Sequence, residues 1–133
     1  MVRELDGVRW INDSKGTNVD ATLKSLEGFR DREVILILGG KDKKGEFERL
    51  RDIVERKVRT VLTIGDAAAK IESKLRGCAP LAACGTMQGA VDYARAAAKP
   101  GEVVLLSPAC ASFDQYHNFE ERGRHFEELV RGL

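Results

Sequence analysis

The sequence predicts an α/β domain with a mostly parallel sheet of about six strands. Short aliphatic runs, such as 34–38 and 103–106, alternate with stretches whose apolar residues recur at helical spacing. A continuous aliphatic run is typical of a strand that is buried on both faces, as in a parallel sheet covered by helices. Asp6-Gly7 separates the runs 2–5 and 8–11 and favours a tight hairpin, which adds one antiparallel edge strand.

Caps and apolar faces predict where the helices begin. Asn18, Asp66 and Thr86 each precede a helical pattern, and Asn118 does so together with Glu121 as a capping pair. The helices are expected at 19–27, 46–56, 67–75, 87–99 and 119–130, and the remaining strands at 58–64 and 81–84. The last helix is expected to bury Phe119, Phe126, Leu129 and Val130. With helices on both faces, the domain should be a Rossmann-like, three-layer structure.

The bulk properties of the chain fit one domain and limit its partners. The 133 residues show no linker, repeat or low-complexity stretch. Because 22 Lys and Arg residues nearly balance 21 Asp and Glu residues, the net charge of +1 gives no general attraction for nucleic acid or an anionic membrane. Any anion site must therefore come from local placement of groups.

The three cysteines favour a reducing compartment. Cys78, Cys84 and Cys110 are an odd set without a Cys-x-x-Cys pair, which predicts free thiols and no metal site. The N-terminus lacks the apolar core of a signal peptide, and no apolar run approaches the ~20 residues of a membrane span. We expect a cytoplasmic protein with no membrane partner.

Ligands of open α/β sheets bind beyond the carboxyl ends of the strands, so the loops there are candidate sites. Three are long and polar, at 12–18, 39–46 and 107–118, whereas the loops at 65–66 and 85–86 read as a turn followed by a helix cap. The first combines Asp13, Lys15 and Thr17 with a helix N-terminus that favours an anion. Its alternative interpretation is a polar loop that only caps the helix.

The second and third loops leave more alternatives open. Gly39-Gly40 beside Lys41, Lys43 and Lys44 indicates either an oxyanion site or a solvated basic turn, and the pattern does not choose among the lysines. It is not a Walker A loop. The third loop offers the Ser112 hydroxyl, small residues that allow close approach, and helix-end N–H groups.

Other side chains near the third loop have plainer interpretations. Cys110 has no evident base beside it and reads as a buried small residue rather than a nucleophile. His117 is expected to be exposed, and His125 to be structural. The residues alone therefore predict an anion-binding rim on an α/β domain.

The same three loops resemble a known family over essentially the whole chain. Asn-Asp-Ser-Lys-Gly-Thr-Asn-Val-Asp-Ala-Thr at 12–22, Leu-Gly-Gly-Lys-Asp-Lys at 38–43 and Leu-Ser-Pro-Ala-Cys-Ala-Ser-Phe-Asp-Gln-Tyr at 106–116, continuing through Asn-Phe-Glu-Glu-Arg-Gly at 118–123, are similar to the Mur ligases. The first block is similar to that of the members that add D-glutamate. The chain would be the C-terminal third, 1–133, of such a three-domain enzyme.

The resemblance implies an activity, its substrates and its cofactors. The full enzyme would use ATP and Mg²⁺, bound mainly by two upstream domains, to join D-glutamate to UDP-N-acetylmuramoyl-L-alanine through an acyl phosphate, a step of peptidoglycan precursor synthesis. This chain alone, without a P-loop, would be inactive. No general base is evident in it.

The resemblance also implies roles for particular residues. Thr17, Lys43 and Ser112 would bind the D-glutamate carboxylates, with backbone help near Phe113 and Phe119. Asp13 and Lys15 would lie near the nucleotide, with Lys15 acting catalytically on phosphate charge. Two alternatives stay open: a stand-alone module that binds an amino acid or nucleotide, and the tail of a folate polyglutamate-adding ligase, against which the Ser-Pro-Ala-Cys-Ala-Ser block argues.

Overall fold

A six-stranded sheet forms the centre of the domain in the computed structural model, which describes residues 1–42 and 44–133. The strands lie in the order β1-β2-β6-β3-β4-β5. Their bounds are β1 Arg3–Leu5, β2 Val8–Asn12, β3 Val34–Gly39, β4 Val58–Ile64, β5 Leu81–Gly85 and β6 Val103–Leu106. Only β1 is antiparallel to its neighbour, so the expected six-stranded sheet with one antiparallel edge strand is confirmed.

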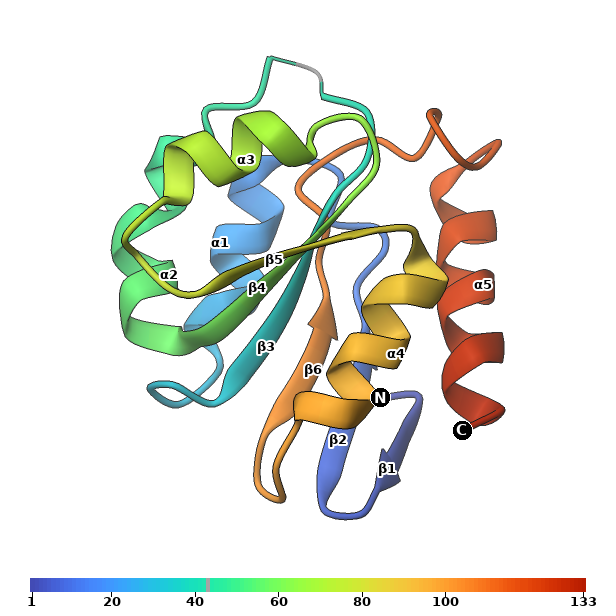
Figure 1. Ribbon diagram of the computed structural model, residues 1–133. Helices are drawn as coiled ribbons and strands as arrows, with labels where there is room; N and C mark the ends of the chain where they lie inside the picture. Colours follow the sequence, from blue (N-terminus) through green and yellow to red (C-terminus); the bar gives the residue numbers. More distant parts are fainter. Residues whose placement is uncertain (43) are drawn as a thin grey trace.

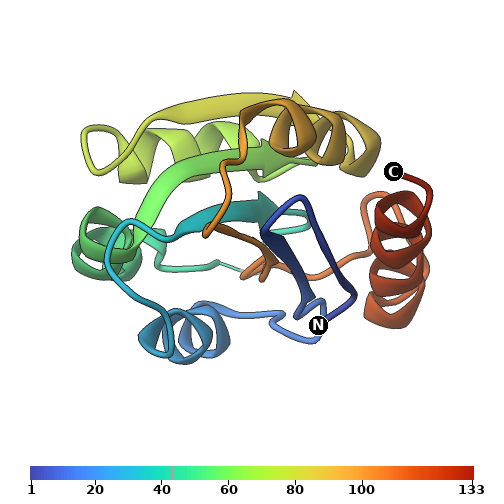
Figure 2. The same ribbon diagram turned by 90° about the horizontal axis from the view of Figure 1, so that it is seen from below.

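Helices cover both faces of this sheet (Figure 1). Their bounds are α1 Val19–Glu27, α2 Arg51–Lys57, α3 Ala68–Leu75, α4 Met87–Ala97 and α5 Phe119–Arg131, with a 3-10 helix at Phe47–Leu50. In Figures 1 and 2, α4 and α5 share one flank of the sheet, and α1 and α2 lie on the other. The three-layer architecture expected from the sequence is confirmed.

The central strand β3 shows why its aliphatic run is continuous. Val34, Leu36 and Leu38 belong to the core cluster that α1, α2 and α3 cover. Ile35 and Ile37 belong to the second cluster, with α4 and α5. Because side chains alternate along a strand, a strand with helices on both sides must be apolar at every position.

The helix starts divide into correct and wrong predictions. Asn18, Thr86 and Asn118 each accept a hydrogen bond from the amide three residues later, as N-caps do. Asp66 does not cap α3: the residue before that helix is Ala67, without a side-chain cap, and the Asp66 amide donates instead to the Asp114 carboxylate at 3.0 Å. The expected cap of α3 is therefore wrong.

Two further helix predictions need correction. The segment expected as one helix at 46–56 begins as the 3-10 helix at Phe47–Leu50 and becomes α-helical only at Arg51. Phe119 was expected in the buried face of α5, but it is 39% exposed. It is the first residue of that helix and lies over the loop end of the sheet, so the core face of α5 starts one turn later.

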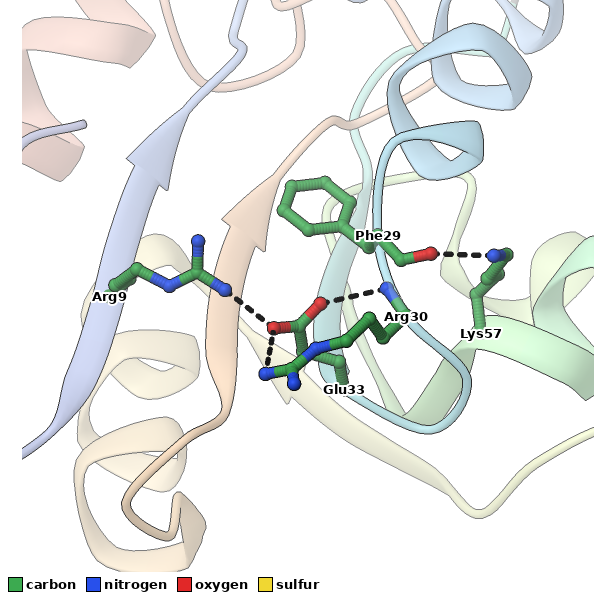
Figure 3. A network of polar contacts seen from close by, with 5 residues as sticks. All are labelled: Arg9, Phe29, Arg30, Glu33 and Lys57. Carbon is green, nitrogen blue, oxygen red and sulfur yellow. Dashed lines mark hydrogen bonds and ion pairs between the residues drawn. The ribbon is translucent and has the colours of Figure 1, made fainter.

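The amino ends of the strands are held by a charged cluster (Figure 3). The Glu33 carboxylate accepts hydrogen bonds from Arg9 Nη2 at 2.5 Å and from the Arg30 backbone amide at 2.8 Å, and Arg30 Nη2 lies 3.2 Å away. Burial raises the pKa of Glu33, but the Arg30 hydrogen bonds and the Arg9 and Arg30 charges outweigh it and hold the pKa below 4.5. This end of the sheet is closed by paired charges.

Candidate functional site

Three loops meet at the carboxyl edge of the sheet because their strands are neighbours. β6 lies between β2 and β3, so the loop at 107–118 runs between the loops at 12–18 and 39–46. The Ala109 amide donates to the Gly16 carbonyl at 2.9 Å, and the Lys41 amide donates to the Ala111 carbonyl at 2.8 Å. The expected convergence of these loops on one edge is therefore seen.

Glycines make this close approach of backbones possible. Gly40 has a φ of +135°, and a Cβ built there would lie 2.3 Å from the Ala111 carbonyl oxygen. A Cβ at Gly65 would lie 2.2 Å from the Asp114 carboxylate. The amides of Gly39 and Lys41 already donate to backbone carbonyls, so they do not act as oxyanion donors. Close packing of the backbone accounts for the Gly39-Gly40 pair.

A pocket of about 310 Å³ opens between the first and third loops and the start of α5. It is lined by Thr17, Ala111, Ser112, Phe113, Asn118, Phe119 and Glu120. Four of the residues that the sequence singles out for substrate binding thus share one cavity, although they lie up to 102 positions apart in the chain, as 119 minus 17 gives. Lys43, the fifth, lies outside the described residues.

The pocket presents hydrogen-bond donors that the fold leaves available. Ser112 is 2% exposed, and within residues 1–42 and 44–133 neither its hydroxyl nor that of Thr17 makes a hydrogen bond. Asn118 Oδ1 accepts a hydrogen bond from the Glu121 amide at 2.7 Å. The Phe119 and Glu120 amides have no acceptor in that part of the chain. Free amides at a helix N-terminus and unpaired hydroxyls suit a carboxylate.

Asp13 and Lys15 lie in a neighbouring hollow. This hollow, of about 450 Å³, is lined by Asp13, Lys15, Gly16, Ala21, Lys24 and Ser25. The Asp13 carboxylate accepts hydrogen bonds from the hydroxyls of Ser107, at 2.8 Å, and Ser25, so it braces the loop against β6 and α1. Lys15 is exposed and has no ion pair with any described residue, which leaves its ammonium free for an anion.

Arg122 is a central residue of this edge that the sequence reasoning missed. It is 1% exposed, and its guanidinium donates to Ser14 Oγ at 2.9 Å, to the Ser14 carbonyl at 2.7 Å and to the Cys110 carbonyl at 2.9 Å. It therefore joins α5 to the first and third loops. Helical spacing carried a signal, because Arg122 lies on the same stripe as Phe126 and Val130.

The remaining side chains singled out near the third loop are structural or exposed. Cys110 is 2% exposed, and burial, followed by the charge of Asp42, raises its pKa to about 12, so its thiol stays protonated and is a poor nucleophile. The side chain of His117 is 92% exposed, as expected. His125 Nδ1 lies 2.6 Å from the Tyr116 hydroxyl and joins α5 to the third loop.

The described residues lack two features, a metal-binding cluster and a membrane-spanning helix. In the described part of the chain, no group of three or more His, Cys, Asp or Glu side chains is arranged to hold a metal ion. No helix within residues 1–42 and 44–133 combines the length and the apolar character that crossing a membrane requires.

Fold and site together define a Rossmann-like α/β domain with a donor-lined pocket at the carboxyl edge of its sheet. Residues 1–110 match the profile of the family described as "Mur ligase, glutamate ligase domain". Because that match covers most of the chain, the chain belongs to the Mur ligase family.

Curated relatives agree with this assignment. The chain is 51% identical to the UDP-N-acetylmuramoylalanine–D-glutamate ligase of Desulfatibacillum aliphaticivorans over 132 residues. These aligned residues cover 99% of this chain and 29% of that protein. It is 52% identical over 129 residues to the ligase of the same name from Acidobacterium capsulatum, covering 97% of this chain and 28% of that protein. It is 51% identical over 132 residues to that of Myxococcus xanthus, 99% of this chain and 29% of that protein. The chain thus spans less than a third of the length of these relatives.

Proposed function

We propose that this chain is the C-terminal, amino-acid-binding domain of a three-domain ligase that adds D-glutamate to UDP-N-acetylmuramoyl-L-alanine at the expense of ATP. The observation that carries the proposal is the single pocket shared by Thr17, Ser112, Phe113 and Phe119. The relatives that carry the D-glutamate ligase name support it over a stand-alone binding module and over a folate polyglutamate-adding ligase. The reaction belongs to peptidoglycan precursor synthesis in the cytoplasm.

The pocket contributes binding and orientation of the amino acid. The Thr17 and Ser112 hydroxyls and the Phe119 and Glu120 amides are neutral donors for carboxylate oxygens, and we assign to Lys43 the matching positive charge. The fixed positions of these hydroxyls and amides hold D-glutamate with its amine directed toward the other substrate. Orientation of two reactants can lower a barrier by up to roughly 7–11 kcal/mol, so we assign to this pocket a positioning role in the reaction.

Lys15 acts on the phosphate side of the same edge. The substrate carboxylate attacks the γ-phosphorus of ATP and releases ADP. The free amine then attacks the acyl carbon, phosphate leaves, and the nitrogen gives up a proton to a base that we assign to the upstream domains. Lys15, in a hollow that Lys24 also lines, offsets the negative charge of the phosphate oxygens during this exchange. Asp13 keeps the Lys15 loop in place through Ser107 and Ser25.

ATP and Mg²⁺ are assigned mainly to the two upstream domains of the longer protein. Among the described residues of this chain, no group of three or more His, Cys, Asp or Glu side chains could hold a metal ion. Because ATP is assigned to the upstream domains, the isolated chain should hydrolyse no ATP, and robust hydrolysis by the purified chain would contradict the assignment.

Substitution of pocket residues in the full-length ligase tests the proposal. Ser112→Ala should weaken D-glutamate binding by about 1–3 kcal/mol, because a desolvated carboxylate loses a donor, while the KM for ATP stays unchanged. Ser73→Ala is the matched control, since the Ser73 hydroxyl bonds to the Lys70 carbonyl on α3 and does not line the pocket. An unchanged D-glutamate KM in Ser112→Ala would remove this pocket from the reaction.

The lysine assignment has its own test. Lys43→Ala should raise the KM for D-glutamate far more than the KM for ATP, because a carboxylate loses its cation. Lys41→Ala and Lys44→Ala are the comparison variants. Should one of these two raise the D-glutamate KM instead, the charge contact moves to that residue.

A further inference from the structure

Glu120 lies on the boundary between the amino-acid pocket and a third hollow, which is distinct from the one that Asp13 and Lys24 line. It is the second residue of α5, and it is exposed. It lines the 310 Å³ pocket together with Thr17 and Ser112, and it also lines a separate hollow of about 270 Å³ together with Lys15. A group bound beside Glu120 can therefore reach both the amino-acid pocket and the side where Lys15 stands.

The carboxylate of Glu120 is uncommitted within residues 1–42 and 44–133. Glu121, the next residue, contacts His117 Nδ1 at 3.0 Å, and Glu127 contacts Asn12 Nδ2 at 3.3 Å. Glu120 has no such hydrogen bond or ion pair with any described residue. Among the described residues that line the amino-acid pocket it is the only acid.

The charges of an amino dicarboxylate explain why one acid belongs in an otherwise donor-lined pocket. Its two carboxylates need donors, which the hydroxyls and helix-end amides supply, but its ammonium needs an acceptor. The nitrogen must also point out of the pocket toward the side of Lys15, whose positive charge repels a cation. Glu120 is the carboxylate that lines both the pocket and a hollow shared with Lys15.

We propose that Glu120 binds the ammonium group of the incoming amino acid and so orients its nitrogen toward the acyl phosphate, where a base of the upstream domains removes the proton and frees the lone pair for attack. This inference rests on the proposed function and extends it from the carboxylates to the amine. It makes the pocket selective for an amino dicarboxylate over a plain dicarboxylate. A carboxylate in the first turn of a helix also stabilises the helix dipole, so the test must separate the two roles.

Glu120→Gln in the full-length ligase, compared with Glu121→Gln, separates them. Both glutamates lie in the first turn of α5, so both substitutions remove the same helix-dipole contribution, but Glu121 does not line the amino-acid pocket. Two readouts are taken: the KM for D-glutamate, and the inhibition constant of glutarate, which keeps both carboxylates and lacks the amine.

Glu120→Gln should raise the KM for D-glutamate about tenfold, the size of one charge-assisted hydrogen bond, and leave the glutarate constant within about threefold. Glu121→Gln should change neither. Equal losses for both ligands, or no loss for D-glutamate, would overturn the ammonium contact while wild-type ligation of D-glutamate still upheld the proposed function. If the wild-type enzyme does not ligate D-glutamate, the function and this inference fall together.

Discussion

The two edges of the sheet differ in how their charged side chains are paired. At the amino edge, charged residues next to the strand starts are paired directly. Glu33 pairs with Arg9 and Arg30 (Figure 3), and Glu102 pairs with Arg59. At the carboxyl edge, the buried Arg122 is held by two carbonyls and a hydroxyl. Lys15 and Glu120, which line the hollows there, have no charged partner among the described residues.

We infer from this difference that the unpaired charges at the carboxyl edge are available to a ligand. A carboxylate that is already paired gains little from another cation, whereas neutral contacts leave the field of a buried cation available to its surroundings. The Asp42–Lys70 pair, at 2.7 Å, is an exception at the carboxyl edge, but neither residue lines the amino-acid pocket. Substitutions at each edge test whether the two differ in this way.

Arg122→Met should lower the free energy of unfolding of the chain by about 3 kcal/mol. Methionine fills part of the space but leaves the Ser14 and Cys110 carbonyls buried without their donor, at roughly 1–3 kcal/mol each. Relief of the buried charge offsets only part of this cost. Urea unfolding followed by the fluorescence of the single tryptophan, Trp10, which is 1% exposed, measures the change.

Arg122→Lys is the matched control for that experiment. Lysine keeps the positive charge but cannot span three acceptors with the geometry of a guanidinium, so an intermediate loss is expected. A loss below about 1 kcal/mol in Arg122→Met would mean that burying the cation costs as much as its hydrogen bonds return. The hydrogen bonds of Arg122 would then not stabilise the carboxyl edge, and the two edges would not differ in this respect.

Glu33→Gln should cost about 1–2 kcal/mol at pH 7, because a buried carboxylate with two arginine partners becomes neutral. Since the pKa of Glu33 is lowered on folding, its charge stabilises the fold above pH 4.5, and this stability is lost as pH falls through the folded pKa. The difference between wild type and Glu33→Gln in urea unfolding should therefore shrink below pH 4.5. A difference that stays constant down to pH 3 would exclude the charge of Glu33 as its cause; Glu128→Gln, an exposed site on α5, is the control.

The strands and caps could be predicted because their causes are local. The run 34–38 is apolar at every position. The Asn18 side chain accepts a hydrogen bond from the backbone amide three residues later. Gathering of the polar loops at one edge also followed, since the carboxyl ends of parallel strands point the same way. That rule, together with the family resemblance, predicted that Thr17 and Ser112 would lie in the same pocket.

The parts that sequence reasoning missed depend on contacts between distant segments. Arg122 donates to Ser14 across 108 positions, and Asp114 accepts a hydrogen bond from the Asp66 amide across 48. Phe119 has the right period for the core, yet the helix starts above the sheet edge and leaves it exposed. No local pattern carries the order of strands that decides these contacts.

The smallest expected effect compares two helix caps at the same edge. Asn118 caps α5 at the pocket and Thr86 caps α4 away from it, each through one exposed hydrogen bond, at 2.7 Å and 3.1 Å. Asn118→Ala and Thr86→Ala should each cost roughly 0.5–1 kcal/mol in urea unfolding. Only Asn118→Ala should also raise the KM for D-glutamate in the full-length ligase, because fraying the first turn of α5 displaces the Phe119 and Glu120 amides. If both caps change stability alike and neither changes that KM, the start of α5 serves the fold alone, and the donors for the carboxylates must be the hydroxyls and the lysine.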